Sequence, residues 1–187
     1  MGHIPTKEEA WDLLCQYNKE EFHLRHARIM EGVMKHFSQE YDPEQSDFWG
    51  IVGLLHDIDF ELYPNDHCVK GLEILRGLDI DERLIHATMS HGDGLPHVEQ
   101  KPEHIMEKIL YATDELTGLI GAVALMRPSK SVQDLELSSV KKKFKQPSFA
   151  AGCSREVIQK GADMLGWPLD ELITRTINAM RALDYID

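Results

Sequence analysis

Residues 43–59 of the chain, PEQSDFWGIVGLLHDID, combine an apolar helical segment with an adjacent His-Asp pair at its end. The Asp42-Pro43 step breaks the chain before this segment. Apolar side chains then recur at the spacing of one helix face. They are Phe48, Ile51, Val52 and Leu55. The pattern predicts a short helix over about residues 43–57 that buries one face and ends in His56-Asp57.

Helical spacing also dominates the segments on either side of this stretch. Thr6-Lys7-Glu8-Glu9 is a capping box that opens the first helix. Residues 116–126 are apolar on nearly all sides, which predicts a buried central helix. No segment shows a convincing two-residue period of a strand. We therefore predict an all-α, compact helical bundle of eight or nine helices. The assigned ranges are about 6–22, 23–40, 43–57, 67–77, 81–91, 102–126, 154–165 and 168–183.

Length and charge restrict the class of protein. The chain has 187 residues, 42% of them hydrophobic, which suits a single domain over residues 1–187. Its 32 acidic and 20 basic residues give a net charge of −12. A surface this acidic repels phosphate backbones, so we expect no binding to duplex nucleic acid or to an anionic membrane. The three cysteines lie far apart and form no CxxC pair, which favours a reducing, cytoplasmic location.

Three polar residues stand where the helical pattern expects burial. His56 and Asp57 end an apolar helix, and burying either is costly unless it is hydrogen-bonded, paired or metal-bound. His26 continues the apolar face of its own helix, three residues before Ile29. His23, one turn earlier, could exchange roles with His26. Each residue taken alone is compatible with an ordinary buried polar side chain.

A mid-helix acidic residue is the fourth candidate. Asp114 precedes the apolar half of the long helix, where an aspartate has poor helix propensity and needs a partner. The neighbouring Glu115 is an alternative. Together, two imidazoles and two carboxylates offer mixed nitrogen and oxygen ligation. Such a set suits Mn, Fe, Co, Ni or Zn, and suits Mg less well.

The order of these residues resembles a known family. A His on one helix, a His-Asp pair about 30 residues later and an Asp on a long helix are similar to the pattern of the HD-domain superfamily of metal-dependent phosphohydrolases. The resemblance covers about residues 23–125 and includes the string LLHDI at 54–58. It implies an HD-type helical domain with a core of about 23–126 and a C-terminal helical extension of about 127–187. The implied metal ligands are His26, His56, Asp57 and Asp114.

The resemblance also implies a larger, binuclear version of the site. His67 opens the segment HCVKGLEIL, and His91 ends the next predicted helix, as in binuclear members of the family. With both, six ligands would hold two ions and Asp57 would bridge them. The family's common His-Asp-Ile-Gly string has Asp59 in place of glycine here. Asp57 and Asp59 are the predicted catalytic residues, with Asp59 orienting water, supporting a ligand or capping a helix.

Lys141-Lys142-Lys143-Phe144-Lys145 is the basic island of this acidic sequence. It is either a solvated helix face or a phosphate clamp. As a clamp it would bind substrate through Lys142 and Lys145, and Arg155 at the start of the next helix would add a further cation. The segment 146–152 would then fold the run over the cleft as a lid.

The resemblance implies a metal-dependent phosphohydrolase that cleaves a small phosphate ester, a nucleotide or a sugar phosphate, with a metal-bound hydroxide. We expect one or two divalent transition-metal ions as cofactor and a small phosphorylated substrate as partner. The sequence does not determine the oligomeric state, and a homodimer is among the states that it allows. Two alternative functions also stay open: a di-iron oxygenase of the same superfamily, and a non-catalytic helical module that senses a ligand and holds a structural metal.

Overall fold

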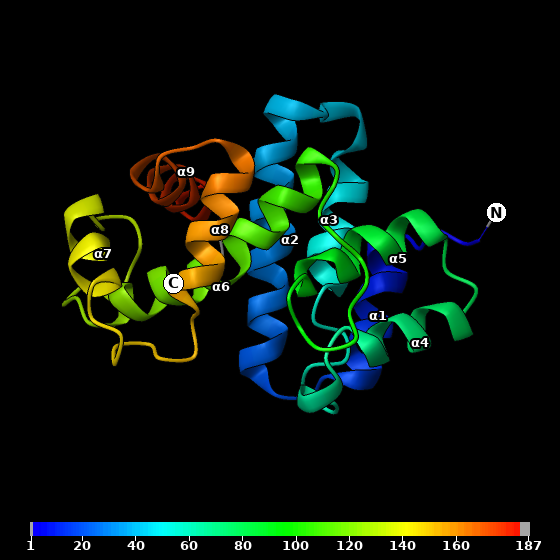
Figure 1. Ribbon diagram of the computed structural model, residues 1–187. Coiled ribbons are helices and arrows are strands. Elements are labelled where there is room, and N and C mark those ends of the chain that lie inside the picture. The colour runs from blue at the N-terminus through cyan, green and yellow to red at the C-terminus, as the bar shows by residue number, and fades with distance from the viewer. Residues whose placement is uncertain (1, 184–187) are drawn as a thin grey trace. The chain divides into compact units, whose positions relative to one another are not determined.

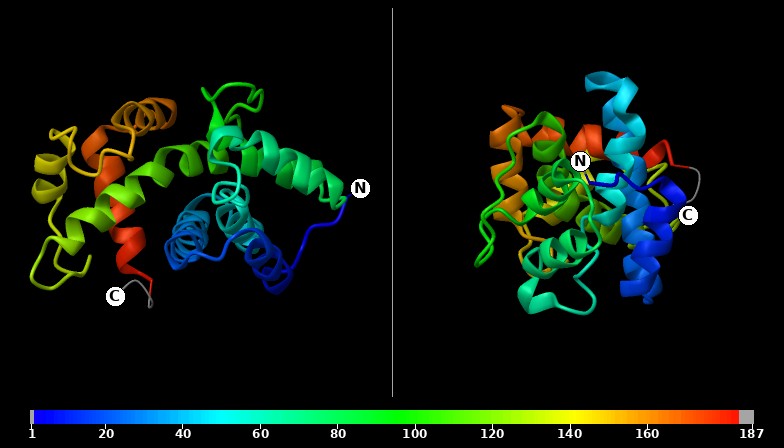
Figure 2. Two further views of the ribbon diagram at one scale, coloured as in Figure 1. Left: turned by 90° about the horizontal axis from the view of Figure 1, so that it is seen from below. Right: turned by 90° about the vertical axis from the view of Figure 1, so that its right-hand side faces the viewer.

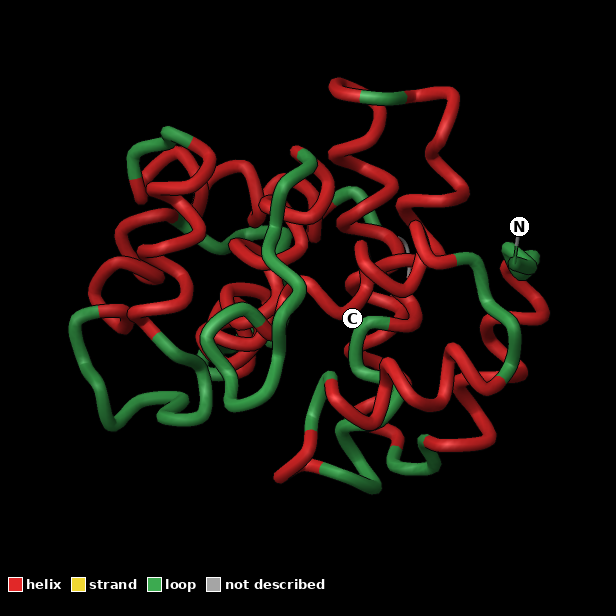
Figure 3. The backbone as a smooth tube through the Cα atoms, turned by 45° about the vertical axis from the view of Figure 1, so that its right-hand side comes forward, coloured by secondary structure: helices red, strands yellow, loops and turns green. Residues whose placement is uncertain are grey.

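The computed structural model describes residues 2–183, and within that range the protein is all-α (Figure 1). Nine α-helices of the described range carry the fold: α1 (Lys7–Tyr17), α2 (Glu21–Tyr41), α3 (Ser46–Leu55), α4 (Val69–Gly77), α5 (Glu82–Met89), α6 (Ile105–Leu125), α7 (Leu137–Phe144), α8 (Arg155–Leu165) and α9 (Leu169–Arg181). No strand occurs between residues 2 and 183 (Figure 3), where an isolated bridge joins His3 and Ile80. The predicted all-α class and number of helices are confirmed.

The first helix begins as predicted and ends early. Thr6 and Glu9 bind each other's main-chain amides, so the predicted capping box is present. α1 ends at Tyr17 and not near residue 22, because Asn18 adopts an extended conformation. The side chain of Asn18 donates a hydrogen bond to the carbonyl of Ile58, which ties the end of α1 to the turn after α3.

α6 and α7 also differ from the predicted ranges. α6 begins at Ile105 and not at Pro102, since the carboxylate of Glu107 accepts hydrogen bonds from two main-chain amides ahead of the helix. α7 lies outside the eight predicted ranges and contains the lysine run as far as residue 144. Within residues 2–183, none of the helices combines the length and the apolar character that a membrane crossing requires.

The chain packs as two compact units, residues 1–107 and 108–187, and the division lies within α6. The first unit holds α1 to α5 with the beginning of α6, and the second holds the rest of α6 with α7 to α9. The predicted core of 23–126 extends across this division. Packing alone does not test how a chain is organised into domains, so the single-domain arrangement stays a prediction.

In the first unit, α2 and α3 lie side by side and make its most extensive helix contact (Figures 1 and 2). Their close approach depends on Gly53, where a Cβ atom would lie 2.5 Å from the carbonyl oxygen of Met30. The two helices bury a shared apolar surface. Its members are Met30, Val33, Met34 and Phe37 from α2 and Ile51, Val52, Leu54 and Leu55 from α3. This packing sets where the end of α3 lies against α2.

In the second unit, α9 packs against both α7 and α8. α8 approaches α6 closely at Gly161, where a Cβ atom would lie 2.4 Å from the Cα atom of Ala112. The apolar half of α6 buries Leu116, Leu119, Ile120 and Val123. Leu125 and Met126 are instead 60% and 68% exposed, so the predicted burial of residues 116–126 is wrong at the C-terminal end.

Candidate metal centre

α3 delivers the His-Asp pair to the interior of the first unit. The helix ends at Leu55, and residues 56–62 continue as tight turns that main-chain hydrogen bonds close. In these turns His56 and Asp59 are fully buried, whereas the side chain of Asp57 is 19% exposed. The apolar packing of α3 therefore holds polar side chains where each needs a partner.

His26 of α2 faces His56 across the contact between α2 and α3. The Nε2 atoms of the two rings lie 3.1 Å apart. The Oδ2 atom of Asp57 lies 3.7 Å from Nε2 of His26 and 3.4 Å from Nε2 of His56. His23 packs its ring against two phenylalanine rings. The structure thus brings His26, and not the alternative His23, to the His-Asp pair.

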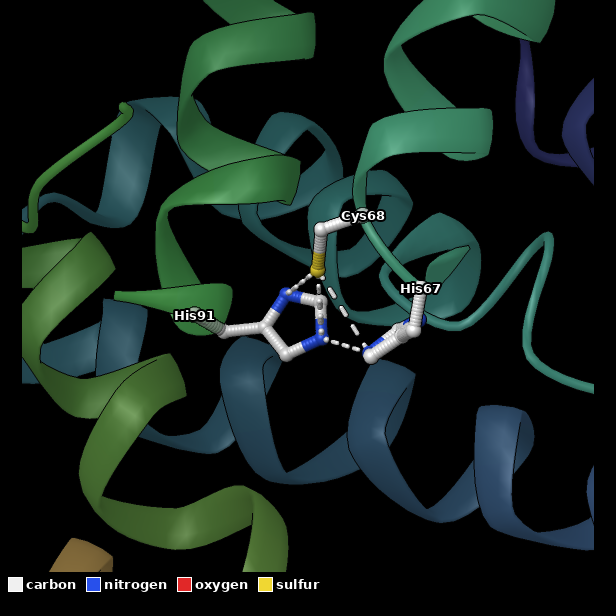
Figure 4. A group of neighbouring side chains, drawn as sticks. All are labelled: His67, Cys68 and His91. Atoms are coloured by element: carbon white, nitrogen blue, oxygen red, sulfur yellow. Dashed lines mark hydrogen bonds between the residues drawn. The ribbon is translucent and has the colours of Figure 1, made fainter. Parts of the chain in front are cut away.

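A second histidine pair lies beside the other oxygen of Asp57. His67 follows the 3₁₀ turn Pro64–Asp66, and His91 lies in the turn after α5. Their Nε2 atoms lie 3.0 Å apart, and Oδ1 of Asp57 lies 3.3 Å from the first and 3.5 Å from the second. The sulfur of Cys68 lies 3.5 Å and 3.6 Å from the same two nitrogens, so three side chains point toward one another (Figure 4).

Asp57 stands between the two pairs with one carboxylate oxygen toward each. Oδ2 faces His26 and His56, and Oδ1 faces His67 and His91. A carboxylate that bridges two cations presents its oxygens in this way. The first unit therefore contains His, Cys and Asp side chains that could hold a metal ion.

Hydrogen bonds on the outer side fix the tautomers of three histidines. His56 and His91 each donate from Nδ1 to the carbonyl three residues earlier, at 2.7 Å and 2.6 Å. His67 donates from Nδ1 to the carboxylate of Asp59 at 2.8 Å. Because these acceptors have no proton to offer, the Nδ1 atom of each ring carries a proton, and Nε2 is the nitrogen that faces the centre. Metal-binding histidines are oriented in the same way.

Asp59 is fully buried and uses both carboxylate oxygens within the protein. Its Oδ1 binds His67, and its Oδ2 accepts a hydrogen bond from the amide of Gly71 at 2.6 Å. Gly71 permits this approach, since a Cβ atom there would lie 2.6 Å from the sulfur of Met89 and 3.2 Å from Oδ2. These contacts favour a positioning role for Asp59, and its catalytic role stays a prediction.

The electrostatics around His67 favour a cation. Burial lowers the pKa of His67, but the hydrogen bond to Asp59 and the contacts with Cys68 and Asp57 outweigh it and raise the pKa to about 10. Burial raises the pKa of Cys68, but the neighbouring rings of His91 and His67 outweigh it and lower the pKa below its ordinary value. A proton between the imidazoles of His67 and His91 would supply this positive charge, and a bound metal ion would displace that proton.

The spacing of the donor atoms suits one ion in each group. Two nitrogens bound at about 2.0–2.1 Å to one metal lie about 2.8–3.0 Å apart in octahedral and about 3.3–3.4 Å apart in tetrahedral coordination, and the separations seen here lie at or between these values. The measured separations are 3.1 Å for His26 and His56 and 3.0 Å for His67 and His91. Imidazole and carboxylate are ordinary ligands of divalent transition metals. The residues present therefore fit such an ion.

Four predicted site residues belong to the second unit. Asp114 lies on α6, Lys142 is exposed on α7, and Lys145 is exposed just after it. Arg155 directs its guanidinium at main-chain carbonyls of residues 143–153, Ala150 among them, and so holds this loop in shape. The substrate contacts predicted for Arg155 and the two lysines, and the ligand role of Asp114, stay predictions.

The sequence pattern does not single out Cys68. The available signal was its position directly after His67, but a cysteine with no second cysteine nearby does not by itself indicate metal binding. The contact with His91, 23 residues away along the chain, brings the sulfur into the cluster. Tertiary packing alone reveals that contact.

Three curated proteins that resemble this chain are enzymes. The chain is 26% identical over 175 residues to the tRNA (cytidine(56)-2'-O)-methyltransferase of Picrophilus torridus. This match covers 84% of this chain and 51% of that protein. It is 33% identical over 113 residues to Ribonuclease Y of Geobacter sulfurreducens and 31% identical to that of Geobacter metallireducens. These matches cover 57% of this chain and 21% of each ribonuclease. The chain thus spans about half of the methyltransferase and about a fifth of the ribonucleases.

Neither a protein-family model nor a solved structure matches the chain.

Proposed function

We propose that this protein is a metal-dependent phosphohydrolase with an HD-type centre that cleaves a small phosphate ester. The observation that carries the proposal is the position of Asp57, whose two oxygens face two separate histidine pairs. This arrangement matches the binuclear centre that the HD-domain resemblance implies. A structural site for one ion would not need a carboxylate between two pairs of imidazoles.

Two groups of side chains are the proposed ligands. We assign one ion to His26, His56, Asp57 and the predicted Asp114, and the second to His67, His91 and the other oxygen of Asp57. Bound divalent ions polarise phosphoryl oxygens and lower the pKa of water toward neutrality. Mn, Fe, Co, Ni and Zn suit these donors, and Mg suits them less well.

The chain itself contributes position and charge. The side chains of Asp57 and His26 are 19% and 17% exposed, whereas that of His56 is fully buried. A substrate would therefore approach from the side of Asp57 and His26. In a metal-bound centre the histidine ligands are neutral, and Asp57 and the predicted Asp114 carry one negative charge each, so a centre with two divalent ions is locally positive and attracts phosphate. This local positive charge offsets the repulsion between a phosphorylated substrate and a chain of net charge −12.

The similarity to Ribonuclease Y supports cleavage of a phosphoester bond, since a ribonuclease cleaves phosphodiester bonds in RNA. The similarity to a tRNA methyltransferase points to a different reaction, and it spans half of that protein. The ligand set around Asp57 supports hydrolysis, because divalent ions held there would activate water for attack on phosphorus. As substrate we propose a nucleotide or a sugar phosphate. We also propose a cytoplasmic location, where the three free cysteines would stay reduced.

The test is hydrolysis by the full chain after chelator treatment and reloading with one metal at a time. Suitable substrates are p-nitrophenyl phosphate, bis-p-nitrophenyl phosphate and a panel of nucleotides. We expect no activity after chelation, recovery with at least one of Mn, Fe, Co, Ni or Zn, and loss in Asp57→Asn. The matched control is Asp47→Asn, whose side chain in the same unit is 90% exposed. Flat activity with every metal, or full activity in Asp57→Asn, would contradict the proposal.

A further inference from the structure

We infer that the sulfur of Cys68 is a ligand of the ion that His67 and His91 hold, so that the two halves of the centre differ chemically. The inference rests on the proposed function, which supplies the ion, and deepens it by adding a thiolate that no sequence motif indicates. One half would offer nitrogen and oxygen donors. The other half, which we call the Cys68 half-site (His67, Cys68, His91 and Oδ1 of Asp57), would offer sulfur as well.

The sulfur and oxygen distances within the Cys68 half-site match one tetrahedral ion, whereas the two imidazole nitrogens, 3.0 Å apart, lie closer together than the about 3.4 Å of a regular tetrahedron. With a metal–nitrogen bond of about 2.05 Å and a metal–sulfur bond of about 2.3 Å, a tetrahedron separates nitrogen from sulfur by about 3.6 Å. The sulfur of Cys68 lies 3.5 Å and 3.6 Å from Nε2 of His67 and of His91. A carboxylate oxygen should lie about 3.4 Å from each nitrogen. Oδ1 of Asp57 lies 3.3 Å and 3.5 Å from them.

The fold makes room for this sulfur and holds it in place. A Cβ atom at Gly92, next to His91, would lie 2.6 Å from the sulfur, so the glycine leaves the space that the sulfur occupies. Cys68 is 1% exposed, and its φ of 66° lies in the left-handed region that a residue other than glycine rarely adopts. Cys68 also precedes the first residue of α4, and a helix N-terminus favours a thiolate.

A thiolate would change which metal this half-site selects. Soft sulfur ligands favour Zn, Co and Fe(II), whereas Mg and Mn prefer oxygen ligands. At limiting Zn or Co we therefore expect the Cys68 half-site to fill before the His26 and His56 half. The thiol releases its proton to solvent when the metal binds. In the rival interpretation the thiol only packs there and donates a weak hydrogen bond to His67.

Titration of the metal-free full chain with Co(II) separates the two interpretations. Thiolate-bound Co(II) absorbs strongly in the near ultraviolet through charge transfer, and Co(II) with nitrogen and oxygen ligands does not. We expect this band in the natural chain and its loss in Cys68→Ser, with metal affinity of that half-site lowered on the order of 10-fold or more. The matched control is Cys15→Ser, a cysteine of α1 in the same unit, which should retain the band.

A second measurement needs no variant. Zn should slow the alkylation of Cys68 in the natural chain, scored by mass spectrometry, and leave Cys15 unchanged. The inference is overturned if Co(II) binds without the band, if the band persists in Cys68→Ser, or if Zn leaves Cys68 unprotected. Absence of any bound metal would overturn the proposed function too. Failure of the proposed function alone looks different: the band and the protection are present, but no metal supports hydrolysis.

Discussion

The carboxylate of Asp59 accepts a hydrogen bond from Nδ1 of His67 at 2.8 Å, and its second oxygen accepts one from the amide of Gly71 at 2.6 Å. Both oxygens of a fully buried carboxylate are thus engaged, one of them by an imidazole of the centre. This contact turns Nε2 of His67 toward Asp57 and His91. A change at Asp59 should therefore act on the metal through His67.

Asp59→Asn should weaken metal binding in the half of the centre that contains His67. Asparagine keeps one acceptor oxygen for Nδ1 of His67, but it loses the charge and places an amide donor against the amide of Gly71, which weakens the contact that orients His67. Such partners of metal ligands are worth about 10- to 100-fold in affinity. Competition against a chromogenic chelator measures the effect. Asp66→Asn, an exposed residue of the preceding turn, is the matched control. Equal affinity in Asp59→Asn and the natural chain would remove the positioning role.

Replacing both His67 and His91 with alanine should lower the metal content from two ions to one per chain. The two rings face one oxygen of Asp57, while His26 and His56 face the other. The reciprocal double variant should also retain one ion, and Asp57→Ala should lose both because the halves share it. Elemental analysis reads the stoichiometry. An unchanged content in the His67 and His91 variant would show that one ion binds.

Gly53→Ala should destabilise the first unit. Its Cβ atom would lie 2.5 Å from the main-chain oxygen of Met30, and rotation of a side chain cannot relieve this clash. Overpacking costs about 1–3 kcal/mol and the gain in helix propensity returns up to about 1 kcal/mol, so we expect a net loss of about 1–2 kcal/mol. Urea unfolding measures it. Gly77→Ala, which would meet no atom within 4 Å, is the control and should change stability little.

Charge reversal of Lys142 and Lys145 tests the phosphate clamp. If the exposed lysines attract an anionic substrate, Lys142→Glu with Lys145→Glu should raise KM roughly 10-fold at low ionic strength, with kcat unchanged and a smaller effect at high salt. Lys130→Glu, an exposed lysine of the same unit, is the control. Steady-state kinetics at two salt concentrations make the comparison. An unchanged KM at low salt would leave the run as a solvated helix face.

Cys153 should react slowly with iodoacetamide in the folded protein. Burial, and to a smaller extent the charge of Glu115, raises the pKa of its thiol to about 11 from an ordinary 9.0. The reactive thiolate is the deprotonated form, so a rise of two pH units in the pKa makes it about 100-fold scarcer at pH 8. Peptide-resolved alkylation should give a rate that still climbs at pH 10, whereas in the unfolded chain it levels off. If alkylation of Cys153 followed the same pH profile in the folded and the unfolded chain, the raised pKa of this thiol would be excluded.

Local sequence patterns were sufficient for the all-α class, for most of the helices and for part of the candidate site, whereas α7 was missed. Helical spacing reports burial within one segment, which is why the all-α class, the capping box at Thr6 and the apolar face that ends at His56 followed from the chain alone. Helix ends were less predictable. α1 stops at Tyr17 because Asn18 contacts Ile58, 40 residues away, and no local pattern carries that information.

The candidate residues followed from the sequence, and their geometry came only from the fold. The His-Asp pair, His26, His67 and His91 were visible as residue types in a family-like order. The contact of Cys68 with His91 was not, and neither were the distances that join His26 and Asp57 to their partners. Contacts between segments depend on how closely the segments approach one another. Here the missing Cβ atom of Gly53 leaves room for the main chain of Met30, and that of Gly92 leaves room for the sulfur of Cys68. Periodicity says which face of a helix is buried, but only packing says what that face meets.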